Sequence, residues 1–310
     1  LNEYALSYDL PNLGKKQQHR LSSGFSINQM NEVNVSTVNN SPVYVQGPEN
    51  PAQIRGNAFF RYAFRRKLYS THYLRMDYNH FTVTDFIADI NPNYLGYGAT
   101  STNYFSLLYE FDYDVRDSKI YPLEGFNIKL TARQTGLGFV PSFPYSYASL
   151  TGVLMYHQKL ANRLYYYNTY KGRLTADKRL PHILNKALGY SEWLSAYEPY
   201  VLDGSDFFIT KFNLKVQLVK PRNSTLPLIK MKQFNKFHYA IYVNAFADMG
   251  YVNNEFPAPT NTMVNLLQFS GGVGLDLVTY YDLVVRVDFA INRYGEYGFF
   301  FHLNTPFLEW

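Results

Sequence analysis

Few side chains in this sequence have a spacing that could support catalysis or metal binding. The seven histidines never occur at the spacing of a zinc protease, which favours isolated histidines over metal ligands. The chain has no Gly-x-Ser-x-Gly nucleophile elbow and no Ser–Lys pair, and Ser270 with His238 does not form a convincing hydrolase pair. We therefore expect no enzyme activity, no metal site and no cofactor.

Two further clusters have structural explanations. A Gly-x-Gly pattern lies within residues 271–274, but no helix follows that could hold a phosphate, so these glycines should mark a bend or close packing in a strand. Glu110, Asp112 and Asp114 form an acidic stripe at every second position. The stripe could bias a pore toward cations, but pairing with basic residues on a neighbouring strand is the preferred interpretation.

Composition excludes several classes of protein. The 310 residues include no cysteine, so disulfides, Fe–S clusters, thiolate zinc sites and cysteine nucleophiles are absent. No stretch approaches 18 consecutive apolar residues, which argues against a transmembrane helix. A formal charge of +5 is too small to indicate nucleic-acid binding.

The dominant hydrophobic period is two. In Tyr104–Val115 the odd positions are apolar or aromatic, whereas the even positions include serine, glutamate and aspartate. Successive side chains of a strand point to opposite faces, so this segment has one apolar and one acidic face. The same alternation recurs in residues 126–133, 208–218, 238–248 and 283–292. A short helix is expected only at 181–196, tight turns at 117–125 and 292–296, and longer loops at about 30–56, 90–102 and 174–205.

Period-two alternation fits either a soluble sandwich with a sealed core or a membrane barrel with an apolar outer face. Repeated charges on the polar face, abundant tyrosine and strands of about ten residues favour the membrane barrel. The predicted fold is therefore an all-β, transmembrane antiparallel β-barrel forming one domain over residues 1–310. At roughly 19 residues per strand and connection the barrel would have about 16 strands.

From residue 57 to the C-terminus the sequence resembles the barrel of the Omp85 superfamily, the outer-membrane assembly and translocation proteins, with residues 1–56 holding the first strands and loops. One match is the family's periplasmic turn, which residues 116–125 resemble through Asp117, Tyr121, Pro122 and Gly125. The residues also suit a tight reversal, since proline pre-sets φ and glycine permits positive φ.

The most specific match is Phe246-x-Asp248-x-Gly250, which resembles the family's aromatic-x-Asp-x-Gly motif on an inward strand face. Residues 271–275 and 282–292 resemble the strands that follow. The chain then ends in an aromatic strand similar to the C-terminal assembly signal, and it runs three residues past the usual terminal Phe. The residues expected to form this seam strand are Tyr297, Gly298, Phe299, Phe301, Pro306 and Phe307.

The sequence departs from the family at the tip of a lumenal loop. Where the family has Val-Arg-Gly-Tyr or Val-Arg-Gly-Phe, this chain has Ser195 for the arginine and Ala196 for the glycine, while Tyr197 fits. The family's arginine pairs with the strand aspartate, here Asp248. Water or Arg286 could replace that arginine, or Asp248 could be an ordinary lumenal carboxylate. The chain also lacks the POTRA domains that precede the family's barrel.

The resemblance implies a protein of the Gram-negative outer membrane that aids insertion or translocation of other proteins. In that mechanism the first and last strands pair weakly, and Gly298 and Pro306 would weaken the last strand further. The alternative is a POTRA-less barrel that has lost insertase activity and acts as a channel, scaffold or complex subunit; an ordinary porin is a third interpretation. Expected partners are outer-membrane lipids including lipopolysaccharide, other outer-membrane proteins or a periplasmic partner, with a homodimer left open and no nucleic acid.

Overall fold

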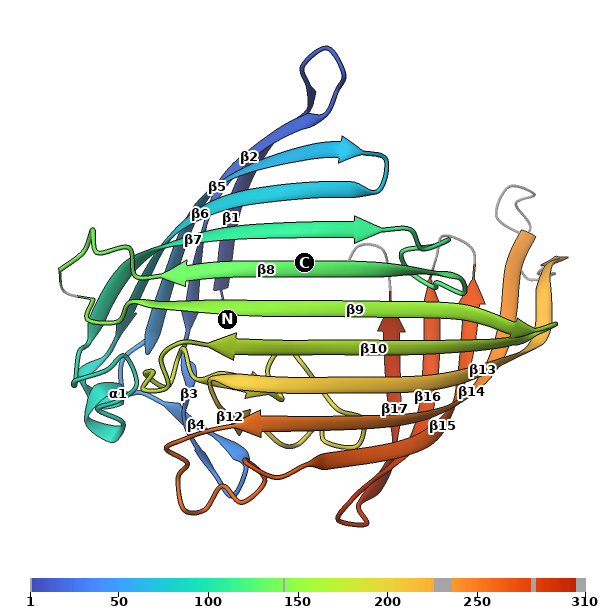
Figure 1. Cartoon of the computed structure of the whole chain (residues 1–310). Coiled ribbons are helices and arrows are strands. Elements are labelled where there is room, and N and C mark those ends of the chain that lie inside the picture. Colours follow the sequence, from blue (N-terminus) through green and yellow to red (C-terminus); the bar gives the residue numbers. More distant parts are fainter. Residues whose placement is uncertain (1, 142, 226–235, 280–282, 305–310) are drawn as a thin grey trace.

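The computed structural model describes residues 2–141, 143–225, 236–279 and 283–304. These residues form a large antiparallel sheet, as the period-two pattern predicted (Figure 1). The strands of the sheet, in spatial order, are β1 (Asn2–Leu13), β2 (His19–Met30), β5 (Gln53–Lys67), β6 (Ser70–Val83), β7 (Ser101–Asp114), β8 (Gly125–Thr135), β9 (Tyr147–Ala161), β10 (Leu164–Thr175), β13 (Asp206–Thr225), β14 (Lys236–Asn253), β15 (Gln268–Thr279), β16 (Val284–Asn292) and β17 (Tyr297–Asn304).

This sheet holds 13 strands within the described ranges, whereas the sequence predicted 16. The prediction assumed one strand per roughly 19 residues, and that mean ignores how much chain the longer loops use. Residues 31–52 form the separate hairpin of β3 (Glu32–Val38) and β4 (Ser41–Gln46), and residues 176–205 contain the pair β11 (Lys186–Leu188) and β12 (Leu202–Asp203). The all-β antiparallel architecture is confirmed, but the count of 16 is not.

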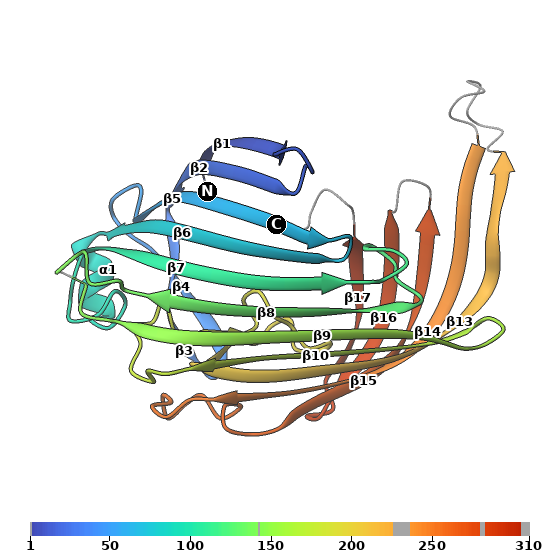
Figure 2. The ribbon, with the colours of Figure 1, turned by 45° about the horizontal axis from the view of Figure 1, so that its top comes forward.

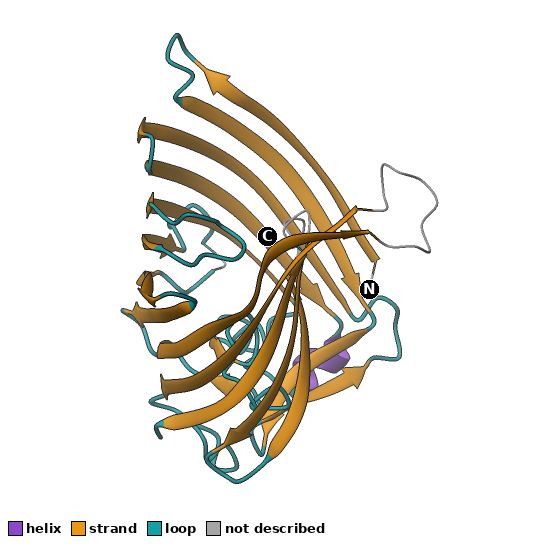
Figure 3. Ribbon diagram, turned by 90° about the vertical axis from the view of Figure 1, so that its right-hand side faces the viewer, coloured by secondary structure: helices purple, strands orange, loops and turns teal. Residues whose placement is uncertain are grey.

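The sheet curls around a concave interior (Figure 3). Outward side chains are apolar and solvent-accessible: Leu107 is 40% exposed and Phe299 79%. Inward side chains are polar and buried, and Asp276 and Ser106 are 0% exposed. A soluble sandwich would bury the apolar side, so the arrangement of the two faces is that of a membrane barrel. We call the polar side the inner face and the apolar side the outer face.

The connections divide between two rims. One rim carries the turns between β1 and β2, β5 and β6, β7 and β8, and β9 and β10. The opposite rim carries the longer connections 31–52, 84–100, 136–146, 176–205 and 254–267. We call them the turn rim and the loop rim. The long β13–β14 hairpin rises beyond its neighbours at the turn rim (Figure 2).

The predicted helix at 181–196 is wrong, because that segment contains turns and strand β11. Gly189 explains the failure, because its φ of 85° lies in the left-handed region and interrupts a right-handed helix in the middle of the segment. The described residues instead form a short helix, α1 (Asp85–Ile90), that follows Thr84 and buries Ile87. No helix in the described part of the chain is long and apolar enough to cross a membrane.

Strands β1 and β17 are the two edges of the sheet, and no ladder joins them in the described residues. Each ladder between neighbouring strands is antiparallel. With an odd number of strands in such a sheet, the two edge strands run in the same direction. Direct closure would therefore need a parallel pairing, unlike every other pairing in the sheet.

Candidate functional site: two latches on the inner face

Residues 176–205, the longest loop of the loop rim, fold onto the inner face of β13 and β14. Leu188, Leu194 and Tyr197 of this loop form one buried cluster with side chains of the two strands, among them Phe207 and Val252. Gly250 on β14 makes room for the loop, because a Cβ there would lie 2.7 Å from a methyl group of Leu194. The loop is therefore seated in the interior and does not extend from the rim.

Asp248 holds the tip of this loop. The Ser195 hydroxyl donates a hydrogen bond of 2.7 Å to Asp248 Oδ2, and the Ser195 amide donates a second of 3.1 Å. Lys211 Nζ on β13 lies 3.7 Å from the same oxygen, and the Asp248 side chain is only 3% exposed. Ser195, at the position where the Omp85 motif has arginine, thus donates to Asp248 as a neutral group. The nearby positive charge is that of Lys211 on strand β13. We call this contact the loop latch.

The other residues of the predicted motif support the latch through packing. Phe246 packs over Gly272 on β15, where a Cβ would lie 2.6 Å from the phenyl ring and 2.1 Å from the Phe289 carbonyl oxygen. Close packing therefore explains one of the glycines in the Gly-x-Gly pattern. Among Phe246, Asp248 and Gly250, only the Asp248 side chain makes a polar contact with the loop. Phe246 packs against β15, and Gly250 leaves space for Leu194.

Tyr197 anchors the loop on its far side. Its hydroxyl donates toward the Phe269 carbonyl oxygen at 3.1 Å and lies 3.2 Å from Gln268 Oε1. Burial raises the pKa of the Tyr197 phenol, so the hydroxyl remains a donor at neutral pH. Asn292 donates to the Ala196 carbonyl oxygen at 3.0 Å, and Ala196 has a φ of 62°. An alanine therefore occupies a left-handed conformation at the position where the family has glycine.

Arg286, considered above as a partner for Asp248, pairs instead with Asp276. The two residues are register partners on β16 and β15, and the guanidinium contacts both carboxylate oxygens, at 2.6 and 2.9 Å. Asn244 donates to Asp276 at 3.0 Å and Lys215 Nζ lies 3.9 Å away. Sequence reasoning missed Asp276, although its inward position opposite Arg286 follows from the same alternation.

The β7–β8 turn enters the interior from the turn rim and reaches the same aspartate. The Tyr121 hydroxyl donates a 2.6 Å hydrogen bond to Asp276 Oδ2. Burial, with the Asp276 charge second, raises the pKa of the Tyr121 phenol and keeps the proton on the hydroxyl. Tyr121 and Leu123 also pack against a buried cluster containing Tyr165 and Tyr242. We call this contact the turn latch.

The backbone of this turn has the geometry that its sequence predicted. Asp117 Oδ1 accepts from the amides of Ser118 at 2.9 Å and Leu123 at 3.0 Å. Gly125 has a φ of 103°, and a Cβ there would lie 2.3 Å from the Val115 carbonyl oxygen, so only glycine fits. Pro122 lies between Tyr121 and Leu123 within the turn.

Strand β17, the predicted seam strand, presents its aromatic residues outward. Tyr297, Phe299 and Phe301 are between 66% and 79% exposed, and Gly298 faces inward opposite Ala290. Pro306 and Phe307 lie outside the described residues. The strand pairs with β16 on one side, and its other edge has no partner strand in the described part of the chain.

Two other predicted clusters have local roles. In the acidic stripe, Glu110 accepts from Thr131 at 3.1 Å with Lys129 at 3.9 Å, and Asp114 pairs with Arg116 at 2.8 Å. Asp112 accepts from Asn127 at 2.6 Å. Pairing with a basic residue of the neighbouring strand, as preferred above, therefore holds for Glu110 alone. Ser270 is the register partner of Asp248, so it is not a neighbour of His238, which lies ten positions earlier on β14.

Comparison with known proteins places this arrangement in a known fold. Neither a family model nor a curated protein matches the sequence. A solved structure does match: BamA from Haemophilus ducreyi lacking POTRA domains 1–3, with 13% identity and a TM-score of 0.65 over 98% of this chain. The chain spans 61% of the length of that structure. It therefore has the fold of the BamA barrel, in line with the resemblance to the Omp85 superfamily.

Proposed function

We propose that the protein is a barrel of the Gram-negative outer membrane that aids insertion or translocation of other proteins at the seam between β1 and β17. The exposed apolar outer face supports a position in lipid, because large apolar side chains at this density are unfavourable in water. Outer-membrane lipids, lipopolysaccharide included, would then be its permanent partners. Other outer-membrane proteins, a periplasmic protein or a second copy of the chain would be its changing partners.

One observation carries the proposal: both edges of the sheet are unpaired in the described residues and run in the same direction. A strand placed between such edges can pair antiparallel with both, as all other neighbours in the sheet do. An exposed strand edge offers a row of unpaired backbone N–H and C=O groups, and lipid supplies no alternative partner for them. The seam therefore has the geometry of a template for an incoming strand.

The proposal is tested by tying the seam shut. Leu6 on β1 and Phe301 on β17 are 65% and 66% exposed, and the chain has no native cysteine. Leu6→Cys and Phe301→Cys, joined by a bis-maleimide in liposomes, should abolish the protease protection of an added unfolded reporter barrel. The matched control joins Leu6→Cys to Phe25→Cys, which are register partners on β1 and β2, and should keep activity.

Full activity of the seam-linked protein would overturn the seam as the route of insertion. Absence of activity in the unlinked protein would instead support the second candidate, a barrel without insertase activity that serves as channel, scaffold or complex subunit. The neutral residue Ser195 at the loop tip favours this candidate, because the family's ionic latch is missing there. The interior filled from both rims favours a scaffold or subunit over a wide channel. Single-channel conductance of the purified protein separates these two roles.

A further inference from the structure

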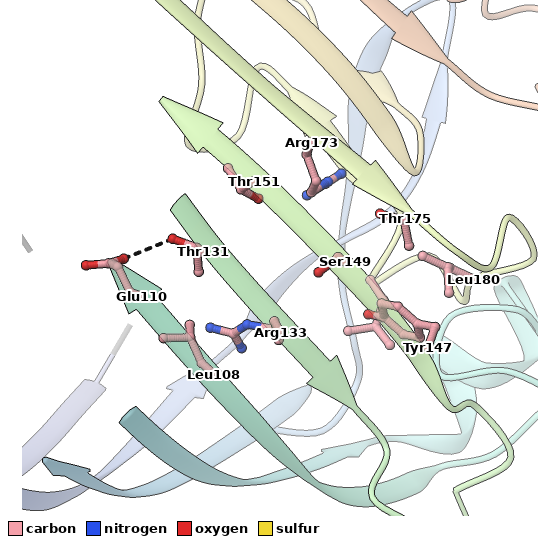
Figure 4. Close-up of a pocket in the computed structure, with 11 residues that line it drawn as sticks. Leu108, Glu110, Thr131, Arg133, Tyr147, Ser149, Thr151, Arg173, Thr175 and Leu180 are labelled. Carbon is pink, nitrogen blue, oxygen red and sulfur yellow. Dashed lines mark hydrogen bonds between the residues drawn. The ribbon is translucent and has the colours of Figure 1, made fainter. Parts of the chain in front are cut away.

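A cavity of about 370 Å³ opens on the inner face of β7 to β10, away from both latches (Figure 4). Its volume lies within the range of small-molecule sites, about 300–1,000 Å³. Leu180 and Leu184, from the long loop, close one side. The rest of the lining is unusually rich in hydroxyl groups and includes two arginines.

Strand register arranges these polar side chains in two adjacent rows. In one row Arg133 on β8 faces Ser149 on β9, which faces Thr175 on β10. In the next row, two positions along each strand, Thr131 faces Thr151, which faces Arg173. Inward side chains of a strand recur at every second residue, so the rows stack on one face. Hydroxyls therefore lie between a guanidinium group on β8 and another on β10, as Figure 4 shows.

Neither guanidinium is matched by a carboxylate. Arg133 makes no hydrogen bond or ion pair to any residue that the structure describes. Arg173 is held in place by the carbonyl oxygens of Lys186, Gly204 and Ser205 at 2.7 to 3.0 Å, which orient the group without neutralising its charge. The acid in the lining, Glu110, accepts from Thr131 and lies 3.9 Å from Lys129. The lining thus holds two guanidinium groups and one carboxylate, so its formal charge is positive.

The geometry points to a binding site for a phosphate group in this cavity, with Arg133 and Arg173 as the cationic ligands and the hydroxyls of Ser149 and Thr151 as donors between them. The Thr131 and Thr175 hydroxyls already donate to Glu110 and to the Ser205 carbonyl oxygen. A guanidinium group such as that of Arg133 binds an oxyanion through two parallel hydrogen bonds that its charge strengthens, and Arg173 has its Nη1 group left to donate. Phosphate has more acceptor oxygens than a carboxylate, and it can accept from two guanidinium groups and two hydroxyls together. The site is separate from the seam and does not depend on the proposed insertion activity.

Titration of inorganic phosphate into the detergent-solubilised protein by calorimetry, at constant ionic strength, tests the site. Wild type should bind one phosphate per chain and bind acetate less tightly. Arg133→Gln removes the free guanidinium and should weaken phosphate binding about 10- to 100-fold, the range for a hydrogen bond to a charged group. Arg133→Lys keeps the charge but loses the paired donors, so its affinity for phosphate should lie between that of wild type and that of Arg133→Gln.

Arg61→Gln is the matched control, because it removes the same charge from an inner-face arginine on β5 that does not line the cavity and whose side chain contacts Ser22 at 3.5 Å. It should bind phosphate like wild type. Equal weakening in both glutamine variants would mean general attraction by the interior and would overturn the site, as would absence of binding in wild type. Thr151→Val, which removes one hydroxyl at constant shape, should weaken binding several-fold while the circular dichroism spectrum stays that of wild type.

Discussion

The loop latch and the turn latch enter the interior from opposite rims and end on aspartates of neighbouring strands, yet they balance charge differently. Asp276, at the turn latch, is paired by Arg286 within the wall, and Tyr121 adds one neutral donor. Asp248, at the loop latch, has Lys211 only at 3.7 Å, and its two short contacts come from Ser195. The turn therefore docks on an aspartate whose charge is already paired within the wall. The loop, in contrast, itself donates the two short hydrogen bonds that Asp248 accepts.

The wall pair under the turn latch should give the largest effect. Arg286→Met leaves Asp276 ionised and fully buried, with neutral donors from Tyr121 and Asn244 and with Lys215, at 3.9 Å, as its nearest cation. Breaking a buried pair from one side typically costs about 3–5 kcal/mol. We expect a correspondingly lower midpoint of urea unfolding in detergent, followed by tryptophan fluorescence. Arg20→Met, in the exposed pair with Asp9, should cost only about 0–1 kcal/mol, and Asp276→Asn should restore part of the stability of Arg286→Met.

Removal of the Ser195 hydroxyl from the loop latch should give the second-largest effect. Ser195→Ala removes the 2.7 Å hydrogen bond to Asp248, and a hydrogen bond to a charged group contributes about 1.5–3 kcal/mol. The loss should be local, so we expect faster amide hydrogen exchange in residues 190–200 with little change in global unfolding. Ser191→Ala, an exposed serine of the same loop, is the control. Equal exchange in the two variants would mean that apolar packing alone seats the loop.

Removal of the Tyr121 hydroxyl from the turn latch should reduce stability less than the short length of its hydrogen bond suggests. Tyr121→Phe deletes a 2.6 Å hydrogen bond, but Asp276 keeps Arg286 and Asn244, so we expect a loss of about 1 kcal/mol in urea unfolding. Tyr69→Phe, a half-exposed tyrosine at the same rim, should be neutral. A loss as large as that of Arg286→Met would show that the turn stabilises Asp276 as much as the wall pair does, and would overturn the comparison.

The two latches also differ in how far the sequence could predict them. Alternation placed Asp248 on the inner face, because that signal is local. That the loop tip with Ser195 and Tyr197 lies near it was implied only by the resemblance to the Omp85 superfamily, and Ser195 was not predicted as the partner of Asp248. Alternation could place both Arg286 and Asp276 on the inner face, but their pairing needed the β15–β16 register, which composition does not fix. Tyr121 was predicted as a turn residue; its reach to a strand 155 positions away is a tertiary contact with no local signal. The antiparallel strand pattern is confirmed, whereas the count of 16 is not, because a mean spacing per strand ignores how much chain the longer loops use.

The smallest predicted effect has the opposite sign and concerns the loop alone. Ala196 has a φ of 62°, which costs an L-residue roughly 1–2 kcal/mol, whereas glycine pays only its extra chain entropy of about 0.5–1 kcal/mol. Ala196→Gly should therefore stabilise the loop by about 0.5–1 kcal/mol and slow its amide exchange.

Ala187→Gly, in β11 of the same loop, is the matched control, because Ala187 is buried in a strand and gains nothing from glycine's freedom. Amide hydrogen exchange of the loop should become faster in Ala187→Gly, by an amount similar to the slowing in Ala196→Gly. If both variants loosened the loop, strain at Ala196 would be negligible, and the difference between the latches would rest on charge alone. If Ala196→Gly slowed the exchange and Ala187→Gly made it faster, the loop latch would differ from the Omp85 motif in two ways, through its neutral donor and through its strained backbone. The position of the loop would then depend on the apolar contacts of Leu188 and Leu194.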